Sequence, residues 1–304
     1  MRKETLGTLL VLTTAIISGF AIPINKLFVV KMEPLVFTAV RALVIGLVFF
    51  LLTTFHNLRF SNEISFRKIP WKYMLPIGLI GGGLAFFLYF TGLKLTTAGR
   101  AAFIHKTLPL YVTVLAFIFL KERITRKQLV ALGLMFFGTV LLVSAKINPA
   151  ELWLNPSLGD LLAIIATICW AVENVISRKA MLQGSTNFSV ACARMFIGSL
   201  FLFSGIIILG KTDALLSLTE AQVISILIST AILFGYVFTW YWGIKLINVS
   251  KASTILLLSP VISLILGALW FGEPVPQIQI LGSALILGGA YLVTRVESRF
   301  VTGV

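Results

Sequence analysis

Long uncharged runs divide this chain into segments that match the length of bilayer crossings. Five of these runs, each 18 to 24 residues long, lie between Glu4 and Lys26, Lys72 and Lys94, Lys127 and Lys146, Glu220 and Lys245, and Lys251 and Glu273. An α-helix needs about 20 apolar residues to cross a bilayer, and its backbone groups satisfy one another in lipid. The strict alternation of a barrel strand is missing, so the pattern predicts membrane-spanning helices.

The whole pattern predicts ten helical spans joined by short polar connections. The spans lie at 5–28, 34–54, 72–93, 98–120, 127–145, 158–180, 187–210, 221–244, 251–271 and 277–294. Composition agrees, because 58% of the residues are hydrophobic and only 12% are charged. The first span is longer than a signal-peptide core and lacks a clear cleavage site, so we expect it to stay in the protein. The expected fold is an all-α polytopic membrane protein.

The second half of the chain repeats the first at a constant offset of 151 residues. The sequence GLKLTTAGRAAFIHKTLPLY begins at Gly92, and GIKLINVSKASTILLLSPVI begins at Gly243. The offset superposes Arg100 on Lys251, Pro109 on Pro260, Glu122 on Glu273, Gln128 on Gln279 and Gly138 on Gly289. We therefore divide the chain into a first repeat at 1–147, a linker at 148–157 and a second repeat at 158–304.

The odd number of spans in each repeat predicts that the two copies have opposite orientations. If the first copy starts inside the cell, the second starts outside, and equivalent hairpins face opposite sides of the membrane. Such inverted repeats are related by a pseudo-two-fold axis in the membrane plane, and rocking about it exposes a central site to each side in turn. This architecture favours a carrier.

The net charge of +14 is distributed as a topology signal. With the N-terminus placed inside, the inner segments hold 16 basic residues, namely Arg2, Lys3, Arg59, Arg67, Lys68, Lys72, Lys121, Arg123, Arg126, Lys127, Arg178, Lys179, Lys245, Lys251, Arg295 and Arg299. The outer segments hold 6, namely Lys26, Lys31, Lys94, Arg100, Lys146 and Lys211. The positive-inside rule then predicts that both termini are cytoplasmic, in the cell membrane, and nucleic acid is not an expected partner.

The repeat also carries a family resemblance over nearly the whole chain. Ten helices as five plus five, with a basic residue, a small residue, a proline and a glutamate closing each half, resemble the EamA family of the drug/metabolite transporter superfamily. The resemblance implies a polytopic carrier, often an exporter of amino acids or other small metabolites, with a cavity lined by spans 1, 3, 4, 6, 8 and 9. One departure is that His105 and Lys106 align with Leu256 and Leu257.

Five ionisable residues fall inside predicted spans: Arg41, His105, Lys106, Glu173 and Arg194. A charge at the centre of a bilayer costs at least ~2.5 kcal/mol, so we expect each of them to face protein or water. Arg41 and Arg194 occupy similar positions in the two repeats. A shared structural role, such as binding helix-end carbonyls, and direct contact with a substrate both fit this placement.

His105 and Lys106 place an imidazole and an ammonium within one helical turn of a proline. Pro109 has no N–H to donate to the carbonyl of His105, and Pro260 likewise has none to donate at the equivalent place in the second repeat. Paired prolines at equivalent depths predict a hinge or an opened binding site. Pro23 predicts a third helix break in the first span. Lys106 also has the alternative of extending toward the membrane surface.

Glu173 is the one acidic residue predicted within the depth of a span. Trp170, Glu173 and Ser177 share a helical face, and Asn174 lies beside them. Glu173 can serve as a proton-coupling site or anchor a substrate amine; the alternative is a charge pair with Lys106, Arg194 or Arg178. We expect Glu173, His105 and Lys106 to flank one polar pocket.

Three aromatic residues complete the candidate site: Tyr89, Tyr236 and Trp240. Their rings can stack on a substrate, or they can belong to an interfacial belt or to helix packing. Cys169 and Cys192 both fall inside spans, which argues against a disulfide framework.

The function that this pattern predicts is secondary transport of a small metabolite, such as an amino acid, by export. No GxxxxGK[ST] stretch, catalytic constellation or metal-ligand spacing occurs in the sequence, so we expect no enzyme, ATP-driven pump, metal or cofactor. A channel-like permease and a small-drug efflux protein are the alternatives. The expected partners are a small-molecule substrate and the lipid bilayer, and both a monomer and a homodimer are compatible with the pattern.

Overall fold

The structure is a computed structural model that describes residues 3–29, 32–60 and 70–297. Within these ranges, ten segments are long and apolar enough to cross a membrane, which confirms the predicted spans. The helices are α1 (Lys3–Val29), α2 (Pro34–Phe60), α3 (Trp71–Pro76), α4 (Ala85–Leu95), α5 (Ala98–His105), α6 (Leu108–Leu120), α7 (Arg126–Ser144), α8 (Glu151–Leu154), α9 (Leu158–Leu182), α10 (Asn187–Cys192), α11 (Gly198–Ile208), α12 (Thr212–Leu216), α13 (Glu220–Leu246), α14 (Val249–Ile255), α15 (Ser259–Phe271) and α16 (Gln277–Thr294).

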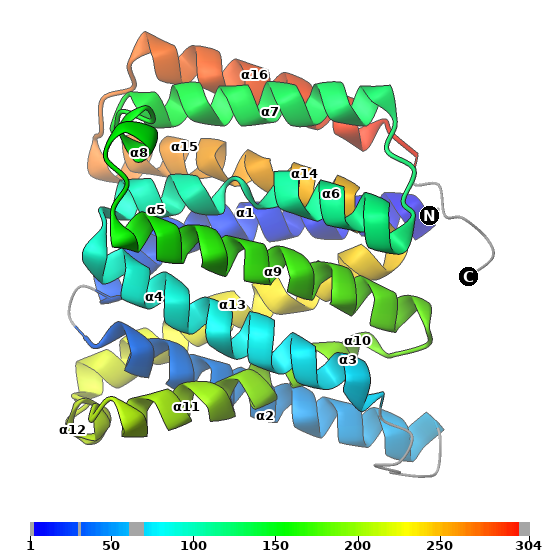
Figure 1. Cartoon of the computed structure of the whole chain (residues 1–304), viewed down its shortest axis with the longest axis vertical. Helices are drawn as coiled ribbons and strands as arrows, with labels where there is room; N and C mark the ends of the chain where they lie inside the picture. The colour runs from blue at the N-terminus through cyan, green and yellow to red at the C-terminus, as the bar shows by residue number, and fades with distance from the viewer. Residues whose placement is uncertain (1–2, 30–31, 61–69, 298–304) are drawn as a thin grey trace.

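The long helices run side by side between two sides of the bundle (Figure 1). We call the side at which α1 begins and α16 ends the terminus side, and the other the opposite side. Two spans contain π-helical segments, Ile77–Leu84 between α3 and α4 and Ala193–Ile197 between α10 and α11, and these segments pack against each other.

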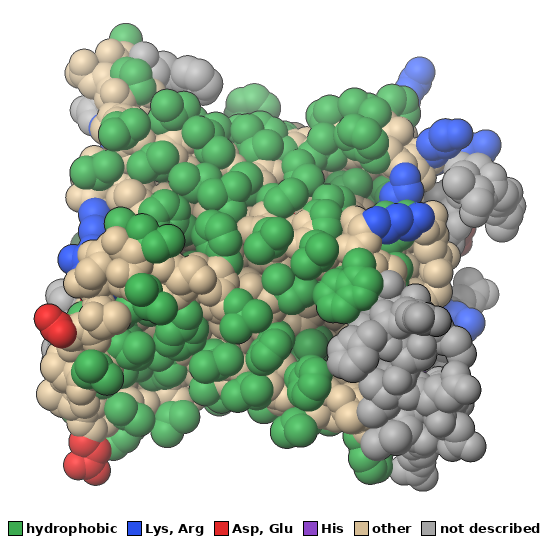
Figure 2. Space-filling view, turned by 60° about the horizontal axis from the view of Figure 1, so that its bottom comes forward, with side chains coloured by type: hydrophobic (Ala, Val, Ile, Leu, Met, Phe, Trp, Pro, Cys, Tyr) green, Lys and Arg blue, Asp and Glu red, His purple; other side chains and the backbone are tan. Residues whose placement is uncertain are grey.

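The outer surface has the character of a membrane protein. Figure 2 shows hydrophobic side chains covering the face between the two sides, with charged side chains at its left and right edges. Exposed basic residues at the terminus side include Lys72, Lys121, Arg123, Arg126, Lys127, Lys245 and Arg295, with the exposed acidic residue Glu297 among them. The exposed acidic residues Asp213, Glu220 and Glu273 lie at the opposite side. Arg2, Lys31, Arg67, Lys68 and Arg299, which contributed to the predicted charge asymmetry, lie outside the described residues.

Helices from the two halves of the chain pack in matching pairs. α4 packs against α9, and its counterpart α13 packs against α1; α7 and α16 pack against each other. Glycines set the close approach in both of the first pairs. A Cβ atom on Gly92 would lie 2.8 Å from the Gly159 carbonyl, and one on Gly243 would lie 3.3 Å from the Gly7 carbonyl. A close contact between two glycines therefore occurs at each of the two sides of the bundle.

The fourth and ninth spans are each divided into two helices at the same place in the repeat. α5 ends at His105 and α6 begins at Leu108, with Pro109 in its first turn. In the ninth span a 3-10 turn, Leu256–Leu258, separates α14 from α15, which carries Pro260 in its first turn. The proline nitrogen cannot donate, so the preceding turn loses its regular hydrogen bond.

The predicted break at Pro23 is wrong. α1 continues through it as one helix from Lys3 to Val29. Proline deprives the Gly19 carbonyl of its helical donor, but the Ser263 hydroxyl, on α15, donates to that carbonyl over 2.9 Å. A neighbouring side chain thus replaces the missing bond, which is the usual way in which membrane helices tolerate proline.

Candidate functional site

Glu173 lies at the centre of a buried polar cluster in the middle of the bundle. Its side chain on α9 is 0% exposed. Oε1 accepts hydrogen bonds from the Ser177 hydroxyl at 2.6 Å and the Tyr241 hydroxyl at 2.7 Å. Oε2 lies 3.1 Å from Nη1 of Arg194, which also donates to the Tyr241 hydroxyl over 3.3 Å. Of the three cations considered from sequence, Arg194 is therefore the partner of Glu173.

The contact between Glu173 and Arg194 is an ion pair that leaves hydrogen-bonding capacity unused. Oε2 of Glu173 and Nε of Arg194 are both buried, and neither has a hydrogen-bond partner among the described residues. The Oε2–Nη1 distance gives Coulombic attraction, but its geometry is not that of a hydrogen bond. A buried acceptor without a donor is rare in folded proteins and marks a place where a ligand or water can bind.

Gly81 determines how closely the third span approaches Glu173. A Cβ atom at Gly81 would lie 2.1 Å from Cγ of Glu173, so only glycine fits there. The Gly81 carbonyl accepts a hydrogen bond from Nε1 of Trp170 over 3.0 Å. Gly81 belongs to the π-helical segment Ile77–Leu84, and such segments occur frequently at functional sites.

Asn174 joins α9 to α13 next to this cluster. Its amide oxygen accepts from Nε1 of Trp240 over 2.9 Å, and its amide nitrogen donates to the Trp170 carbonyl over 2.8 Å. The Tyr236 ring stacks on Trp240 with a centroid separation of 6.4 Å. Trp240 is buried, whereas Tyr236 is half-buried, so only Tyr236 of this pair presents substantial accessible surface.

His105 lies against the aromatic side of the same cluster. Its ring meets Trp170 edge-on at 5.0 Å and Tyr89 at 5.9 Å. Trp170 thus connects His105 on the fourth span with Glu173 one turn further along α9.

Lys106 turns toward the ninth span. Its Nζ donates to the Ser259 hydroxyl, at the start of α15, over 2.8 Å. His105, Lys106 and Tyr89 are half-buried, although each contacts another helix of the bundle. Their repeat counterparts Leu256 and Leu257 are buried. The polar pair therefore opens accessible surface where the second repeat has packed leucines.

Arg41, which has a similar position in the first repeat to that of Arg194 in the second, has a different environment. Its Nη1 donates to the Ser229 hydroxyl over 2.6 Å and to Oδ1 of Asn25 over 3.3 Å, and its guanidinium covers the Phe37 ring at 4.2 Å. These partners are side chains, and within the described ranges Arg41 forms no ion pair with a carboxylate.

Sequence reasoning missed three contributors to the cluster: Gly81, Tyr241 and Ser259. Tyr241 follows Trp240 directly, and Gly81 begins a run of three glycines, so both had a local signal. Ser259 precedes Pro260 at the break in the ninth span. Across the described residues, no group of three or more His, Cys, Asp and Glu residues is arranged to hold a metal ion.

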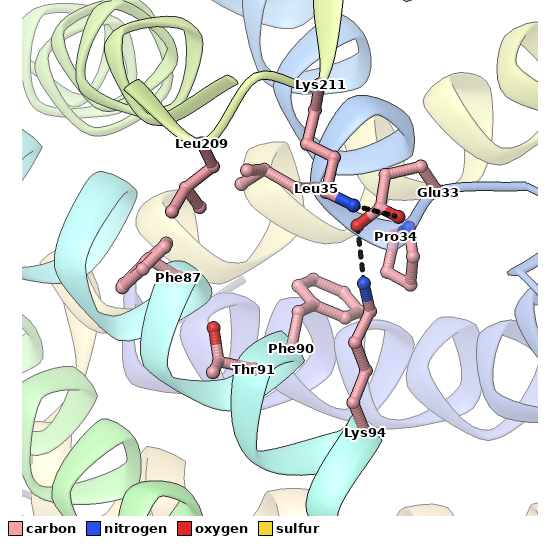
Figure 3. Close-up of a pocket in the computed structure, with 9 residues that line it drawn as sticks. All are labelled: Glu33, Pro34, Leu35, Phe87, Phe90, Thr91, Lys94, Leu209 and Lys211. Carbon is pink, nitrogen blue, oxygen red and sulfur yellow. Dashed lines mark hydrogen bonds and ion pairs between the residues drawn. The ribbon is translucent and has the colours of Figure 1, made fainter. Parts of the chain in front are cut away.

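A separate pocket of about 160 Å³ lies at the opposite side, between the beginning of α2, the end of α4 and the residues after α11 (Figure 3). Glu33 binds Lys94 there at 2.7 Å and approaches Lys211 at 4.0 Å. Phe87 and Phe90 form part of its apolar lining. The pocket contains none of the candidate residues predicted from sequence.

A family model accounts for most of the chain. The model of the EamA-like transporter family matches residues 5–144 and 157–295. The chain belongs to this family. Together with its ten apolar spans, this makes the EamA-like transporter a multi-pass membrane protein.

Individual relatives give the same classification. The chain is 30% identical over 233 residues, 75% of this chain and 74% of the relative, to "Uncharacterized transporter YyaM" of Bacillus subtilis strain 168. It is 25% identical over 295 residues, 93% of each protein, to a "Probable amino-acid metabolite efflux pump" of Salmonella typhimurium strain LT2. A solved crystal structure matches with a TM-score of 0.78 and 20% identity, over 96% of this chain and 98% of the other, and shows the fold.

Proposed function

We propose that this EamA-like transporter is a secondary carrier that exports a small zwitterionic metabolite, such as an amino acid. The observation that carries the proposal is the buried Glu173, whose Oε2 faces Arg194 but accepts no hydrogen bond from the described residues. A substrate ammonium can donate to this oxygen, and Lys106 supplies a positive charge for a substrate carboxylate.

The surroundings of Glu173 support a solute of this kind. Tyr89, His105 and Tyr236 contribute half-buried aromatic surface, which can cover the apolar part of a small molecule. The Tyr236 ring stacks on Trp240, which donates to Asn174 beside Glu173, so this ring belongs to the surroundings of the cluster. One relative is named an amino-acid metabolite efflux pump, which agrees with the proposed substrate class.

Alternating access between two inverted repeats is the proposed mechanism. The matching glycine contacts at the two sides and the equivalent breaks in the fourth and ninth spans support it. The concentration of basic residues at the terminus side supports a cytoplasmic location for both termini. The two repeats that we propose to move against each other are residues 1–147 and 158–304. We propose no catalytic reaction.

Counterflow in proteoliposomes tests this function. Liposomes preloaded with pooled amino acids, nucleobases, sugar phosphates or polyamines would be diluted into labelled substrate, and saturable uptake is expected for the amino-acid pool. Glu173→Gln is expected to lower that rate, and Glu220→Gln, at the exposed start of α13, serves as the matched control.

Two results would overturn parts of the proposal. Conductance without saturation or counterflow would identify a channel-like permease and remove the carrier mechanism. Saturable exchange of apolar drugs, with none of amino acids, would keep the carrier mechanism and remove the proposed substrate class.

A further inference from the structure

Glu122 forms a buried clasp between the fourth and ninth spans at the terminus side. α6 ends at Leu120, and the left-handed conformation of the next residue, Lys121 (φ 53°), turns the chain so that Glu122 reaches α14. Its Oε1 accepts from the Val249 amide at 2.9 Å. Its Oε2 accepts from the Ser250 amide at 3.1 Å and the Ser250 hydroxyl at 2.5 Å. Gln128 donates to the same hydroxyl over 3.0 Å.

Two opposing effects act on this carboxyl group. Burial raises the pKa of Glu122, and the hydrogen bonds from Ser250 and Val249 and the charge of Arg178 oppose the rise. Opening the clasp would return the carboxyl group to water and remove these donors together. The closed and open arrangements therefore exchange one set of favourable interactions for another, as a reversible contact requires.

The repeat places the same parts at the opposite side, where they are arranged differently. Gly272 has the left-handed conformation of Lys121 (φ 62°), but Glu273 is 43% exposed and pairs with Lys146 at 2.5 Å. The counterpart of Ser250 is Gly99, which has no hydroxyl.

Gln279, the counterpart of Gln128, also differs. Its Nε2 donates to the Leu142 carbonyl over 3.2 Å, and its buried Oε1 has no hydrogen-bond partner in the described part of the chain. Gln128 thus supports a formed clasp, whereas Gln279 occupies the same place in the repeat with an unused acceptor.

Packing follows the same difference between the two sides. α6 packs extensively against α14 at the terminus side, whereas their counterparts α15 and α5 form no contact of comparable extent at the opposite side. Every residue of α14 is buried. Of the equivalent positions 102 and 253, Ala102 on α5 is half-buried and Ser253 on α14 is 0% exposed. The fourth and ninth spans therefore pack more extensively at the terminus side than at the opposite side.

We infer that Glu122 and Glu273 are alternate clasps, which hold the fourth and ninth spans together at the terminus side and at the opposite side in turn. In the conformation described here, Glu122 is engaged and Glu273 is held by Lys146. When the opposite side closes, Glu273 exchanges Lys146 for the backbone amides at the beginning of α5. The inference rests on the proposed alternating access, and it adds the residues that position each closed state.

Cysteine accessibility tests the inference without a transport assay. In a background with Cys169 and Cys192 replaced by alanine, Ala102→Cys or Ser253→Cys would be labelled with a charged thiol reagent in purified protein. Ala102→Cys is expected to react readily and Ser253→Cys slowly. Adding Glu122→Gln is expected to raise the rate at position 253 and lower it at position 102, each by about tenfold. Glu273→Gln is the matched control and leaves position 253 protected.

The inference is overturned if folded Glu122→Gln protein, verified by gel filtration, keeps the wild-type labelling pattern at both positions. If Glu122→Gln does not fold, Ser250→Ala takes its place in the test. It removes one hydrogen bond of the clasp, so we expect a smaller shift of the labelling rates in the same direction. Expected labelling in a protein without counterflow would overturn the proposed function and leave the clasp intact. Counterflow with unchanged labelling would overturn the clasp and leave the proposed function intact.

Discussion

The Glu122 clasp and its copy at Glu273 have similar sequences but different contacts. Glu122 is buried and accepts three hydrogen bonds from α14, whereas Glu273 is exposed and pairs with Lys146. The difference lies in the arrangement of the spans, because both glutamates follow a helix that ends in a left-handed residue. It indicates which side of the bundle is closed, a property of the conformation that the repeat alone does not determine.

A second pair of contacts is preserved at both sides and so belongs to the scaffold. Arg100 at the start of α5 binds Asp160 at 2.8 Å, and Lys251 near the start of α14 binds Glu4 at 3.0 Å. Each pair joins the fourth or ninth span to the first turns of α9 or α1. These ion pairs are formed at both sides, whereas the contacts of Glu122 and Glu273 differ between the sides. The comparison therefore separates contacts that we expect to stay fixed from contacts that we expect to change.

The largest effect is expected from a comparison of the two buried arginines. Arg194→Ala leaves Glu173 as an unpaired buried charge and should lower the free energy of unfolding by about 3–5 kcal/mol. Arg41→Ala, at the similar position in the first repeat, removes hydrogen bonds to Ser229 and Asn25 and should cost about 1.5–3 kcal/mol. Thermal unfolding of both purified variants measures the difference, and an equal or larger loss in Arg41→Ala would contradict the central role of the Glu173 pair.

An intermediate effect is expected from overpacking the site that both closed states share. Gly81→Ala places a methyl group 2.1 Å from Cγ of Glu173, and such overpacking costs about 1–3 kcal/mol. Counterflow should fall, because Glu173 is displaced from Arg194 and Tyr241. Gly288→Ala is the control, since nothing lies within 4 Å of a Cβ atom there. Equal counterflow in the two variants would remove Gly81 from the site.

The smallest effect is expected from restoring the missing hydroxyl at the opposite side. Gly99→Ser supplies the counterpart of Ser250, and its Cβ atom would lie 2.8 Å from Cγ2 of Ile147, which disfavours the present conformation. One added hydrogen bond is worth about 0.5–1.5 kcal/mol, so labelling at Ala102→Cys should slow by about two- to tenfold. Gly133→Ser, where a Cβ atom meets nothing within 4 Å, is the control. Faster labelling in Gly99→Ser would count against the second clasp.

Much of the fold was predictable because spacing alone determines it. The ten spans follow from the charge-free runs, and the equivalent breaks near Pro109 and Pro260 follow from proline chemistry. Pro23 shows where this reasoning stops. The same chemistry predicted a break there, but Ser263, far away in the sequence, supplies the missing donor to Gly19.

The site was predictable as a set of residues but not as a set of contacts. Burying charge in a bilayer is costly, which identified Glu173, His105 and Lys106 as candidates. Which of three cations pairs with Glu173 depends on how α9 and the segment that holds Arg194 each pack on Ile77–Leu84, where Gly81 lies against Glu173 and Gly82 against the Arg194 carbonyl. The sequence could not predict that only Glu122 is engaged, because Glu122 and Glu273 occupy equivalent positions in the two repeats.

Distances between spin labels at equivalent positions of the two sides test the central claim most directly. One labelled pair would replace Arg123 and Lys245 at the terminus side, and the other would replace Pro274 and Lys94 at the opposite side; all four are exposed. Pulsed electron paramagnetic resonance would be recorded with and without Glu122→Ala in the cysteine-free background. The account predicts that Glu122→Ala lengthens the first distance and shortens the second. Two distances that stay constant, or that change in the same direction, would contradict it.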